Sequence, residues 1–440
     1  MIILGINAYH ADSSAAIFRD GIMIAATEEE RFRRVKHWAG FPSMAIEFCL
    51  REAGVTLKEV DHIAIGRDPK AKLAQKALFF GKNALTSLDF GFIKDRFTNQ
   101  KKVTSVETEL AQLSGLSEEE IKPKIHQIEH HRSHMGSAFF ASPFEEAAVL
   151  TIDGSGDFTT TMFGYGKGTR IEILDSIDFP HSIGVFYSAF TQLLGFPHYG
   201  DEYKVMGLAP YGNPQYISKF REVLQWKDKG LFELDLSYFR PATKGYVSYE
   251  EHIPVVPPLY SEKMEDLFGA VRKKGEELTQ YHKDLAASVQ RFTEETIVHL
   301  LDGLHERVGG DRVCIAGGVA QNSVSNGKIT RTTPFKQVYI PSAGHDAGIS
   351  MGAAQFAYHH VLEQKRVPAI YSAYTGARFS NEEVEEMLKA KGIAYTRYSD
   401  DELFERVTDR IIDAGVIGWF NGRAGVGPRA LGARSILAGP

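Results

Sequence analysis

Two histidines and two aspartates in this sequence have the residue types and spacing of a transition-metal site. His130 and His134 stand four residues apart in HHRSH, so a helix would place both imidazoles on one face, about one turn apart. Asp153 ends an apolar run in TIDGSGD, and Asp346 stands at a predicted helix start in SAGHDAG. Imidazoles and carboxylates together suit Fe(II), Mn(II) or Zn(II) better than Mg(II), which prefers oxygen ligands. We therefore predict a metal site formed by His130, His134 and Asp346, with Asp153 as an optional fourth ligand; for the two histidines alone, the alternative is a surface cluster at a helix end.

Three glycine-rich segments follow apolar runs, as phosphate-binding turns do. They are 153–156 (DGSG), 317–322 (GGVAQN) and 342–344 (SAG). Backbone N–H groups at such turns bind phosphate, and glycine lets the backbone approach the ligand closely. Three of them in one chain favour a nucleotide cleft over three unrelated tight turns. The residues predicted to line this cleft are Gly154, Ser155, Gly317, Gly318, Asn322 and Gly344.

The segment 422–435, GRAGVGPRALGARS, combines arginines with glycines. Arginine side chains bind phosphate oxygens at two points. Pro428 is placed to begin a helix, and the run VIGWF before the segment predicts a buried strand. We predict an anion site here, with a basic surface turn as the alternative. Its candidate residues are Arg423, Arg429, Arg434 and Ser435.

Two further side chains are candidates for proton transfer and charge neutralisation. His37 ends the charged segment EEERFRRVKH, which lies between a predicted strand and Phe41-Pro42. In an ordered loop His37 would serve as a base for a hydroxyl; the alternative is a charged exit from the strand. Lys204, in DEYKVMGLAPYG, would neutralise phosphate charge; the alternative is an exposed loop lysine.

The elements that must position these residues follow a pattern that occurs twice. Residues 2–8, 15–18 and 22–27 predict three strands, with a hairpin signal at Asp20-Gly21. The strand–turn–strand pattern returns near residue 147, which predicts a duplicated fold. A domain boundary is expected near Pro368. Helices are predicted at 43–54, 263–308, 345–362, 380–391 and 400–413, and further strands at 312–316 and 415–420.

The segment 67–102 carries nine Lys or Arg residues against three Asp residues. This composition predicts a solvated helical insertion. A lid or a surface for an anionic ligand is the alternative.

Composition excludes several classes of protein. The formal net charge of −6 argues against nucleic acid as an obligatory partner, because phosphate binding needs clustered Lys and Arg. Two cysteines in apolar settings, Cys49 and Cys314, do not make a disulfide framework. The N-terminus does not resemble a signal peptide, and no apolar run reaches 18 residues. The sequence therefore predicts a cytoplasmic enzyme without a membrane span.

Together these motifs resemble those of the NodU/CmcH family of O-carbamoyltransferases. The resemblance implies an α/β fold with a duplicated RNase H-like (ASKHA, actin-like) domain at 1–366, whose halves are about 1–146 and 147–366. It implies that 367–440 is the start of a YrdC-like module, within which the chain stops. The matching stretches, in the family's order over nearly the whole chain, are LGINAYHADSSAA, EEERFRRVKHWAGFP, HHRSHMGSAFFASPFEEAAVLTIDGSGD, SIGVFYSAFTQLLGF, DEYKVMGLAPYG, CIAGGVAQN, PSAGHDAG and GPRALGARSIL.

The resemblance also implies an activity and its cofactors. In the family, the YrdC-like module makes carbamoyl adenylate from carbamoyl phosphate and ATP, with Mg(II), and the metal-bearing domain passes the carbamoyl group to a hydroxyl of a small molecule. The four predicted ligands match the family's metal-ligand pattern, usually assigned to Fe(II). His10 is a further catalytic candidate, but many relatives carry this histidine directly before Asp, whereas Ala11 separates His10 from Asp12 here. Relatives commonly have an acidic residue where Gly425 stands.

Three other functions are compatible with parts of this pattern. A tRNA threonylcarbamoyl transferase would share the metal-bearing core but not GPRALGARSIL, and it would need a tRNA-binding surface. A sugar-kinase-like phosphotransferase would use Mg(II) with a catalytic Asp and would not need HxxxH. A non-catalytic nucleotide-binding module is the third. The identity of the acceptor and the question of a homodimer stay open.

Overall fold

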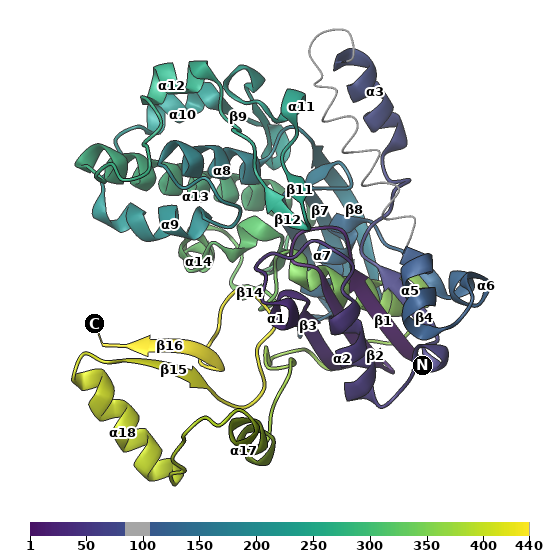
Figure 1. The fold of residues 1–440 in the computed structure, drawn as a ribbon. Coiled ribbons are helices and arrows are strands. Elements are labelled where there is room, and N and C mark those ends of the chain that lie inside the picture. Colours follow the sequence, from purple (N-terminus) through teal and green to yellow (C-terminus); the bar gives the residue numbers. More distant parts are fainter. Residues whose placement is uncertain (84–105, 440) are drawn as a thin grey trace.

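The computed structural model describes residues 1–83 and 106–439. The charged segment predicted as a helical insertion lies partly outside this range. Its described part forms helix α3, Leu73–Asn83, which projects from the body of the molecule (Figure 1). Lys72, just before α3, contacts Ser176 and Asp178 of the second sheet. The choice between an insertion and a lid stays open.

The first sheet has five strands in the order β3-β2-β1-β4-β5. The first three strands form an antiparallel meander, and β4 and β5 run parallel to β1. Asp20 and Gly21 between β2 and β3 both have positive φ, as the predicted tight hairpin requires. The strands are β1 (Ile2–Asn7), β2 (Ser14–Arg19), β3 (Ile22–Glu28), β4 (His62–Ile65) and β5 (Ile125–Gln127).

The second sheet repeats this topology in the order β14-β13-β6-β7-β8. Again three strands form an antiparallel meander, and two later strands add in parallel beside the first of them. The duplicated RNase H-like α/β fold is therefore confirmed. The strands are β6 (Glu146–Gly156), β7 (Thr159–Lys167), β8 (Arg170–Asp178), β13 (Arg312–Ala316) and β14 (Gln337–Tyr339).

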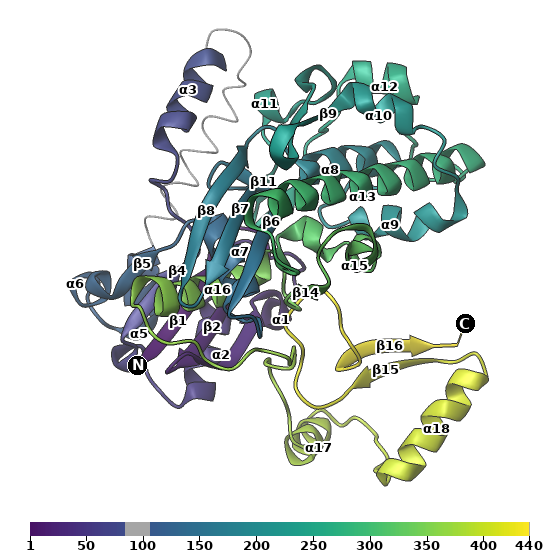
Figure 2. The ribbon, with the colours of Figure 1, turned by 180° about the vertical axis from the view of Figure 1, so that it is seen from behind.

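Helices separate and cover the two sheets, which gives five layers (Figures 1 and 2). Helix α16 packs on the first sheet, α7 packs on the second, and the two helices pack against each other. Alternation along β6 sends Val149 toward α7 and Leu150 toward α8 and α13. Helix α2 covers the outer face of the first sheet. These helices are α2 (Ser43–Ala53), α7 (His130–Phe139), α8 (Ile183–Leu193), α13 (Gln280–Val308) and α16 (Ile349–Phe356).

Glycines allow α7 and α16 to approach very closely. A Cβ on Gly352 would lie 1.7 Å from the carbonyl oxygen of Ser133, and one on Gly136 would lie 2.4 Å from the carbonyl oxygen of Gly352. The predicted 345–362 helix begins as a 3-10 turn, Asp346–Gly348, before α16. Because Asp346 directly precedes α16, the close packing of α16 on α7 sets the distance between Asp346 and the histidines of α7.

Several shorter elements surround this core. Residues 263–308, predicted as one or two long helices, form two, α12 and α13, with a non-helical segment at 269–279 between them. The shorter elements are α1 (Glu30–Arg33), α5 (Val106–Ser114), α6 (Glu118–Ile121), α9 (Glu202–Leu208), α10 (Ile217–Val223), β9 (Leu224–Lys227), β10 (Leu231–Leu234), α11 (Pro241–Lys244), β11 (Ser248–Glu250), β12 (Ile253–Val255), α12 (Glu262–Phe268), α14 (Ser323–Asn326) and α15 (Ile329–Thr332). No helix in the described ranges has the length and apolar character of a membrane span.

The C-terminal segment forms a separate two-stranded sheet beside two helices (Figure 1). The prediction that Pro428 begins a helix is wrong, because residues 428–433 form turns and irregular structure. The prediction that VIGWF is buried is also wrong, because β15 alternates between exposed and half-buried residues. An apolar strand is buried only where something packs on both faces. The elements are α17 (Asn381–Ala390), α18 (Asp400–Ile412), β15 (Val416–Phe420) and β16 (Arg434–Ala438).

Candidate metal centre

The structure brings the four predicted ligands together between the two sheets. His130 and His134 lie in the first two turns of α7, whose start is capped by the Glu129 carboxylate accepting from Arg132 N at 2.8 Å. Asp153 comes from β6 and Asp346 from the turn before α16. One donor atom from each residue lies within 4.8 Å of all the others, and all four residues are buried.

The spacing of the donor atoms suits a single ion. His130 Nε2 lies 3.1 Å from Asp153 Oδ2 and 3.6 Å from Asp346 Oδ1. His134 Nε2 lies 3.6 Å and 3.5 Å from the same two oxygens. Two ligands about 2.1 Å from an ion, at angles of about 90–110°, are themselves about 3.0–3.5 Å apart. His134 Nε2 and Asp346 Oδ1 are also buried without a hydrogen-bond partner among the described residues, so the donor set fits a divalent transition metal.

Burial and charge shift the pKa values of these groups in opposite directions. Burial lowers the pKa of His134, but attraction from the nearby carboxylates of Asp153 and Asp346 outweighs it and raises the pKa to about 9. Burial also opposes the ionisation of Asp153, yet the hydrogen bond from His130 and attraction from His134 hold its pKa well below the usual range. The two carboxylates are therefore ionised, and His134 supplies one positive charge between them.

His10 reaches the same cluster in spite of its shifted place in the sequence. Its Nδ1 lies 2.9 Å from Asp346 Oδ2, whereas His130 and His134 lie nearest to the other carboxylate oxygen, Oδ1. Burial lowers the pKa of His10, but attraction from Asp346 outweighs this and raises it. Asn7 Nδ2 donates to the carbonyl oxygens of Ala11 and Asp346, which ties the loop of His10 to the metal-ligand turn. Its catalytic role stays a prediction.

His37 and Lys204 lie in different settings. His37 is largely buried beside Asp12, with its ring in edge contact with Tyr199 at 5.0 Å between centroids. Lys204 lies in helix α9 rather than in a loop, and its ammonium pairs with Asp201 at 2.6 Å. Asp201 is thus the partner of the Lys204 charge in this structure, and the predicted role of Lys204 at phosphate stays a prediction.

The predicted nucleotide-binding glycines gather beside Asp153. Gly318 N donates to Asp153 Oδ1 at 2.9 Å, and Gly317 N donates to the carbonyl oxygen of Gly344 at 2.7 Å. Gly317 has φ 101°, and a Cβ there would lie 2.1 Å from the carbonyl oxygen of Ile152. These glycines therefore let the segment after β13 pack directly on β6.

The other residues of that prediction have different surroundings. The DGSG segment is not a turn: β6 continues to Gly156, and the chain turns at residues 157–158. Gly154 packs against the Tyr246 ring, and Ser155 is half-buried in β6. Asn322 caps α14 and exchanges hydrogen bonds with Gln290. Nucleotide binding by this set stays a prediction.

The arginine segment contacts both halves of the molecule, through Glu52 in the first and Tyr203 in the second. Arg423 donates to the carbonyl oxygens of Thr375 and Gly376, and Arg434 donates to that of Gly427 at 2.8 Å. Arg429 is exposed, and its guanidinium carbon lies 5.5 Å from the Tyr203 ring centroid. Ser435 Oγ accepts from the N–H of Gly432. Two of the three guanidinium groups thus hold the loop itself.

Sequence reasoning missed the residue that anchors this loop. Glu28 is 1% exposed, and its carboxylate accepts from Gly427 N at 2.8 Å and pairs with Arg31 at 2.9 Å. Arg31 in turn donates to the carbonyl oxygen of Gly427 at 3.1 Å. The only sequence signal was EEER at 28–31, and a charged segment of this composition is equally typical of an exposed turn.

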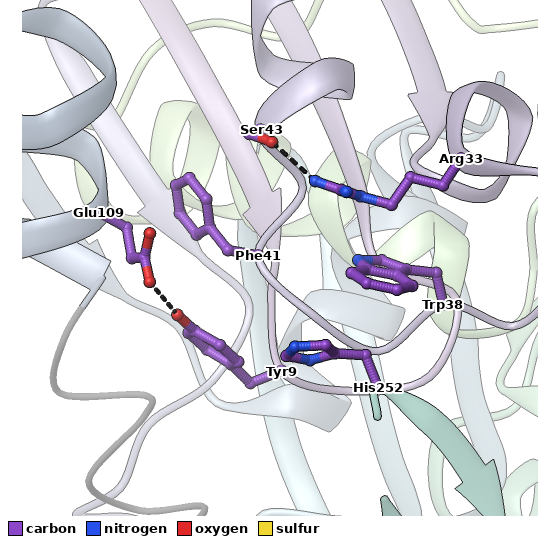
Figure 3. Close-up of a pocket in the computed structure, with 7 residues that line it drawn as sticks. All are labelled: Tyr9, Arg33, Trp38, Phe41, Ser43, Glu109 and His252. Carbon is purple, nitrogen blue, oxygen red and sulfur yellow. Dashed lines mark hydrogen bonds between the residues drawn. The ribbon is translucent and has the colours of Figure 1, made fainter. Parts of the chain in front are cut away.

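A cavity of about 450 Å³ is lined by residues next in sequence to His10 and His37 (Figure 3). Tyr9 and Trp38, the chain neighbours of these two histidines, line it. Its charged groups are partnered: Glu109 accepts from Tyr9 OH at 2.9 Å, and Arg33 donates to Glu29 at 2.8 Å. The remaining lining residues are Phe41, Ser43 and His252.

Comparison with known proteins identifies the family of this chain. The family model described as carbamoyltransferase N-terminus matches residues 2–355, and the model described as carbamoyltransferase C-terminus matches residues 408–440. The chain belongs to the carbamoyltransferase family of enzymes. Both models run in the order that the sequence motifs indicated.

Individual relatives cover the whole of this chain but are longer. An uncharacterized protein, sll1178, of Synechocystis is 41% identical over 100% of this chain and 71% of its own length. Nodulation protein NolNO of Sinorhizobium fredii is 34% identical over 99% of this chain, which spans 59% of that protein. Among solved structures, component A of the (R)-2-hydroxyglutaryl-CoA dehydratase of Acidaminococcus fermentans is 14% identical, with a TM-score of 0.40 over 82% of this chain and 99% of that one. A likeness of that size carries no functional argument.

Proposed function

We propose that this chain transfers a carbamoyl group to a hydroxyl of a small-molecule acceptor. The observation that carries the proposal is the convergence of His130, His134, Asp153 and Asp346 in the core of a carbamoyltransferase-family fold. The proposed donor is carbamoyl phosphate, activated by ATP with Mg(II) to carbamoyl adenylate in the C-terminal module. Arg423, Arg429, Arg434 and Ser435 are the proposed contacts for carbamoyl phosphate, and the glycines beside Asp153 are those for nucleotide.

The four buried ligands would hold Fe(II) or another divalent transition metal. A divalent ion bound there supplies Lewis-acid polarisation of the carbamoyl carbonyl. The chain's own groups do the rest. Gly318 N orients the Asp153 carboxylate, and His10 holds the second oxygen of Asp346. His37 takes the proton of the acceptor hydroxyl.

The proposal is tested by a transfer assay on protein reconstituted anaerobically with Fe(II). The protein is incubated with carbamoyl phosphate, Mg-ATP and a panel of sugars and other hydroxyl compounds, and products are followed by mass spectrometry. We expect an acceptor heavier by one carbamoyl group, formed only with both metal and ATP. Phosphorylation of an acceptor that needs Mg(II) alone would instead establish a kinase-like activity and overturn the proposal.

Metal binding is expected to release about one proton near pH 7. His134, with a pKa of about 9, is protonated in the metal-free protein, and a metal ion must displace that proton. Observed affinity should therefore rise about tenfold for each pH unit between about pH 7 and pH 9. Calorimetric titration with Mn(II) in buffers of different ionisation enthalpy measures both quantities. An affinity that does not change across this range would contradict the prediction.

A further inference from the structure

Two loops meet beside the metal centre, and each presents a non-glycine residue with a left-handed backbone. Asp12 has φ 56° and His37 has φ 58°. Such residues persist where the surroundings hold them, and they gather at functional sites. Here Glu30 Oε2 accepts from His37 N at 2.8 Å, and Ser13 N donates to the carbonyl oxygen of Trp38 at 2.9 Å. The two loops are therefore held together on both sides of the pair.

The two side chains form one hydrogen-bonded unit. His37 Nδ1 lies 2.8 Å from Asp12 Oδ1, and the side chains are 19% and 6% exposed. A neutral imidazole that donates Nδ1–H to a carboxylate presents Nε2 as an acceptor. His37 Nε2 is buried and has no hydrogen-bond partner within the described ranges. This is the tautomer that a general base requires.

A glycine packs next to Nε2. A Cβ on Gly200, which has φ 83°, would lie 2.6 Å from His37 Nε2. Tyr199, the preceding residue, places its ring edge-on against the imidazole. A side chain at position 200 would press against the nitrogen that has no hydrogen-bond partner in the described part of the chain, so glycine lets the two loops pack at this point.

Asp12 also connects this histidine to the metal-ligand turn. Its Oδ2 lies 3.8 Å from Nε2 of His345, the residue before Asp346. Asn7 Nδ2 donates to the carbonyl oxygens of Asp12 and Asp346, at 3.3 Å and 3.0 Å. Through Asp12 and Asn7, the position of His37 is thus tied to the turn that carries the metal ligand Asp346.

We infer that Asp12 is a positioning residue that orients His37 as the base for the acceptor hydroxyl, an inference that rests on the proposed function. In the transfer step, the hydroxyl proton passes to His37 Nε2 as the acceptor oxygen bonds to the carbamoyl carbon. The bond from that carbon to the leaving phosphate oxygen breaks, and its electron pair leaves with AMP. His37 then returns the proton to solvent.

The charges around His37 favour this role. Burial lowers the pKa of His37, but the hydrogen bond and attraction from Asp12 outweigh it and raise the pKa above the ordinary value. Lys36 opposes this shift and Glu30 adds to it. Tyr199 is the titratable neighbour on the facing loop, and Glu202 lies within electrostatic reach. Burial opposes ionisation of Asp12, yet His37 and His345 hold its pKa below the usual range, so Asp12 stays charged.

The test replaces Asp12 with Asn in the metal-loaded protein. We expect kcat to fall about 10²–10⁴-fold, as when the orienting carboxylate of a catalytic histidine is lost, with metal content unchanged. Because a base must be deprotonated and Asp12 raises the pKa of His37, the acidic limb of the kcat profile should move to lower pH. The matched control is Asp20→Asn, an exposed aspartate that also has positive φ, which should change nothing.

A second readout does not depend on activity. In protein with ¹³C-labelled histidine, the His37 signal, assigned with His37→Gln, should titrate at lower pH in Asp12→Asn than in the wild type. If the wild type transfers no carbamoyl group, the proposed function fails. The His37 titration then still tests whether Asp12 and His37 form a hydrogen-bonded pair. An unchanged His37 titration, or an unchanged kcat and pH profile in an active enzyme, overturns the inference. If Asp12→Asn does not fold, His37→Gln is used, and an unaltered kcat in that variant overturns the inference equally.

Discussion

Replacement of His130 by Ala is expected to remove the transition metal and abolish carbamoyl transfer. The variant loses the nitrogen that lies 3.1 Å from Asp153 Oδ2 and 3.6 Å from Asp346 Oδ1. The remaining ligands would hold the ion at least about 100-fold more weakly, since even outer-sphere changes at metal sites lower affinity 10–100-fold. Elemental analysis of anaerobically purified protein should find about one equivalent of metal in the wild type and almost none in the variant.

His126→Ala provides the matched control. His126 lies in β5, is not fully buried, and its Nε2 contacts His62 Nδ1 at 3.0 Å, so its loss removes an imidazole without touching the metal-ligand cluster. It should keep the metal and the transfer activity. Unchanged metal content in His130→Ala would show that His130 is not a metal ligand and would overturn the assigned site. A wild type without transition metal under all loading conditions would remove the basis of the proposed mechanism.

Gly352→Ala is expected to destabilise the protein by about 3 kcal/mol or more, the upper end for overpacked cores. The new Cβ would lie 1.7 Å from the carbonyl oxygen of Ser133, a backbone atom that no side-chain rotation can move away. Helices α7 and α16 would have to separate, and His134 would move relative to Asp346. For a chain of 440 residues the melting temperature should fall by roughly 3 °C or more, and metal content should fall with it.

Gly207→Ala tests whether the effect is due to helix contact rather than to loss of glycine. Gly207 lies within α9, and nothing stands within 4 Å of the Cβ it would carry. Alanine should stabilise that helix by up to about 1 kcal/mol. Calorimetric scans of both variants make the comparison. A Gly352→Ala protein with the wild-type melting temperature would mean that the two helices do not touch in solution as described.

Much of the fold was predictable because its signals are local. Residues 2–28 contain three strands with a hairpin at Asp20-Gly21, and the same pattern near residue 147 indicated the duplication. The helices of the C-terminal segment were also placed to within a residue or two. Predictions failed where an element's surroundings decide its state. VIGWF has the composition of a buried strand but lies in a two-stranded sheet with exposed residues.

The metal ligands of the candidate site were predictable from the sequence, but the residues that hold the surrounding loops in place were not. HxxxH places two imidazoles on one face of any helix, so His130 and His134 were visible from spacing alone. Asp12 and Glu28 had no such signal, because each acts through a contact with a residue far along the chain. Asp12 meets His37 and Glu28 meets Gly427 only after the loops have packed.

By itself, the sequence determined the family, the duplicated α/β fold and the side chains able to bind a metal. These follow from residue type and from periodicity within one element, which act over a few positions. Only the tertiary structure showed that glycines let α7 and α16 pack closely together. It also brought His10 to Asp346 and placed Asp12 beside His37, which is the basis of the inferred orienting role. Such relations depend on distances between atoms of different elements, and those distances exist only once the two sheets have packed their helices between them.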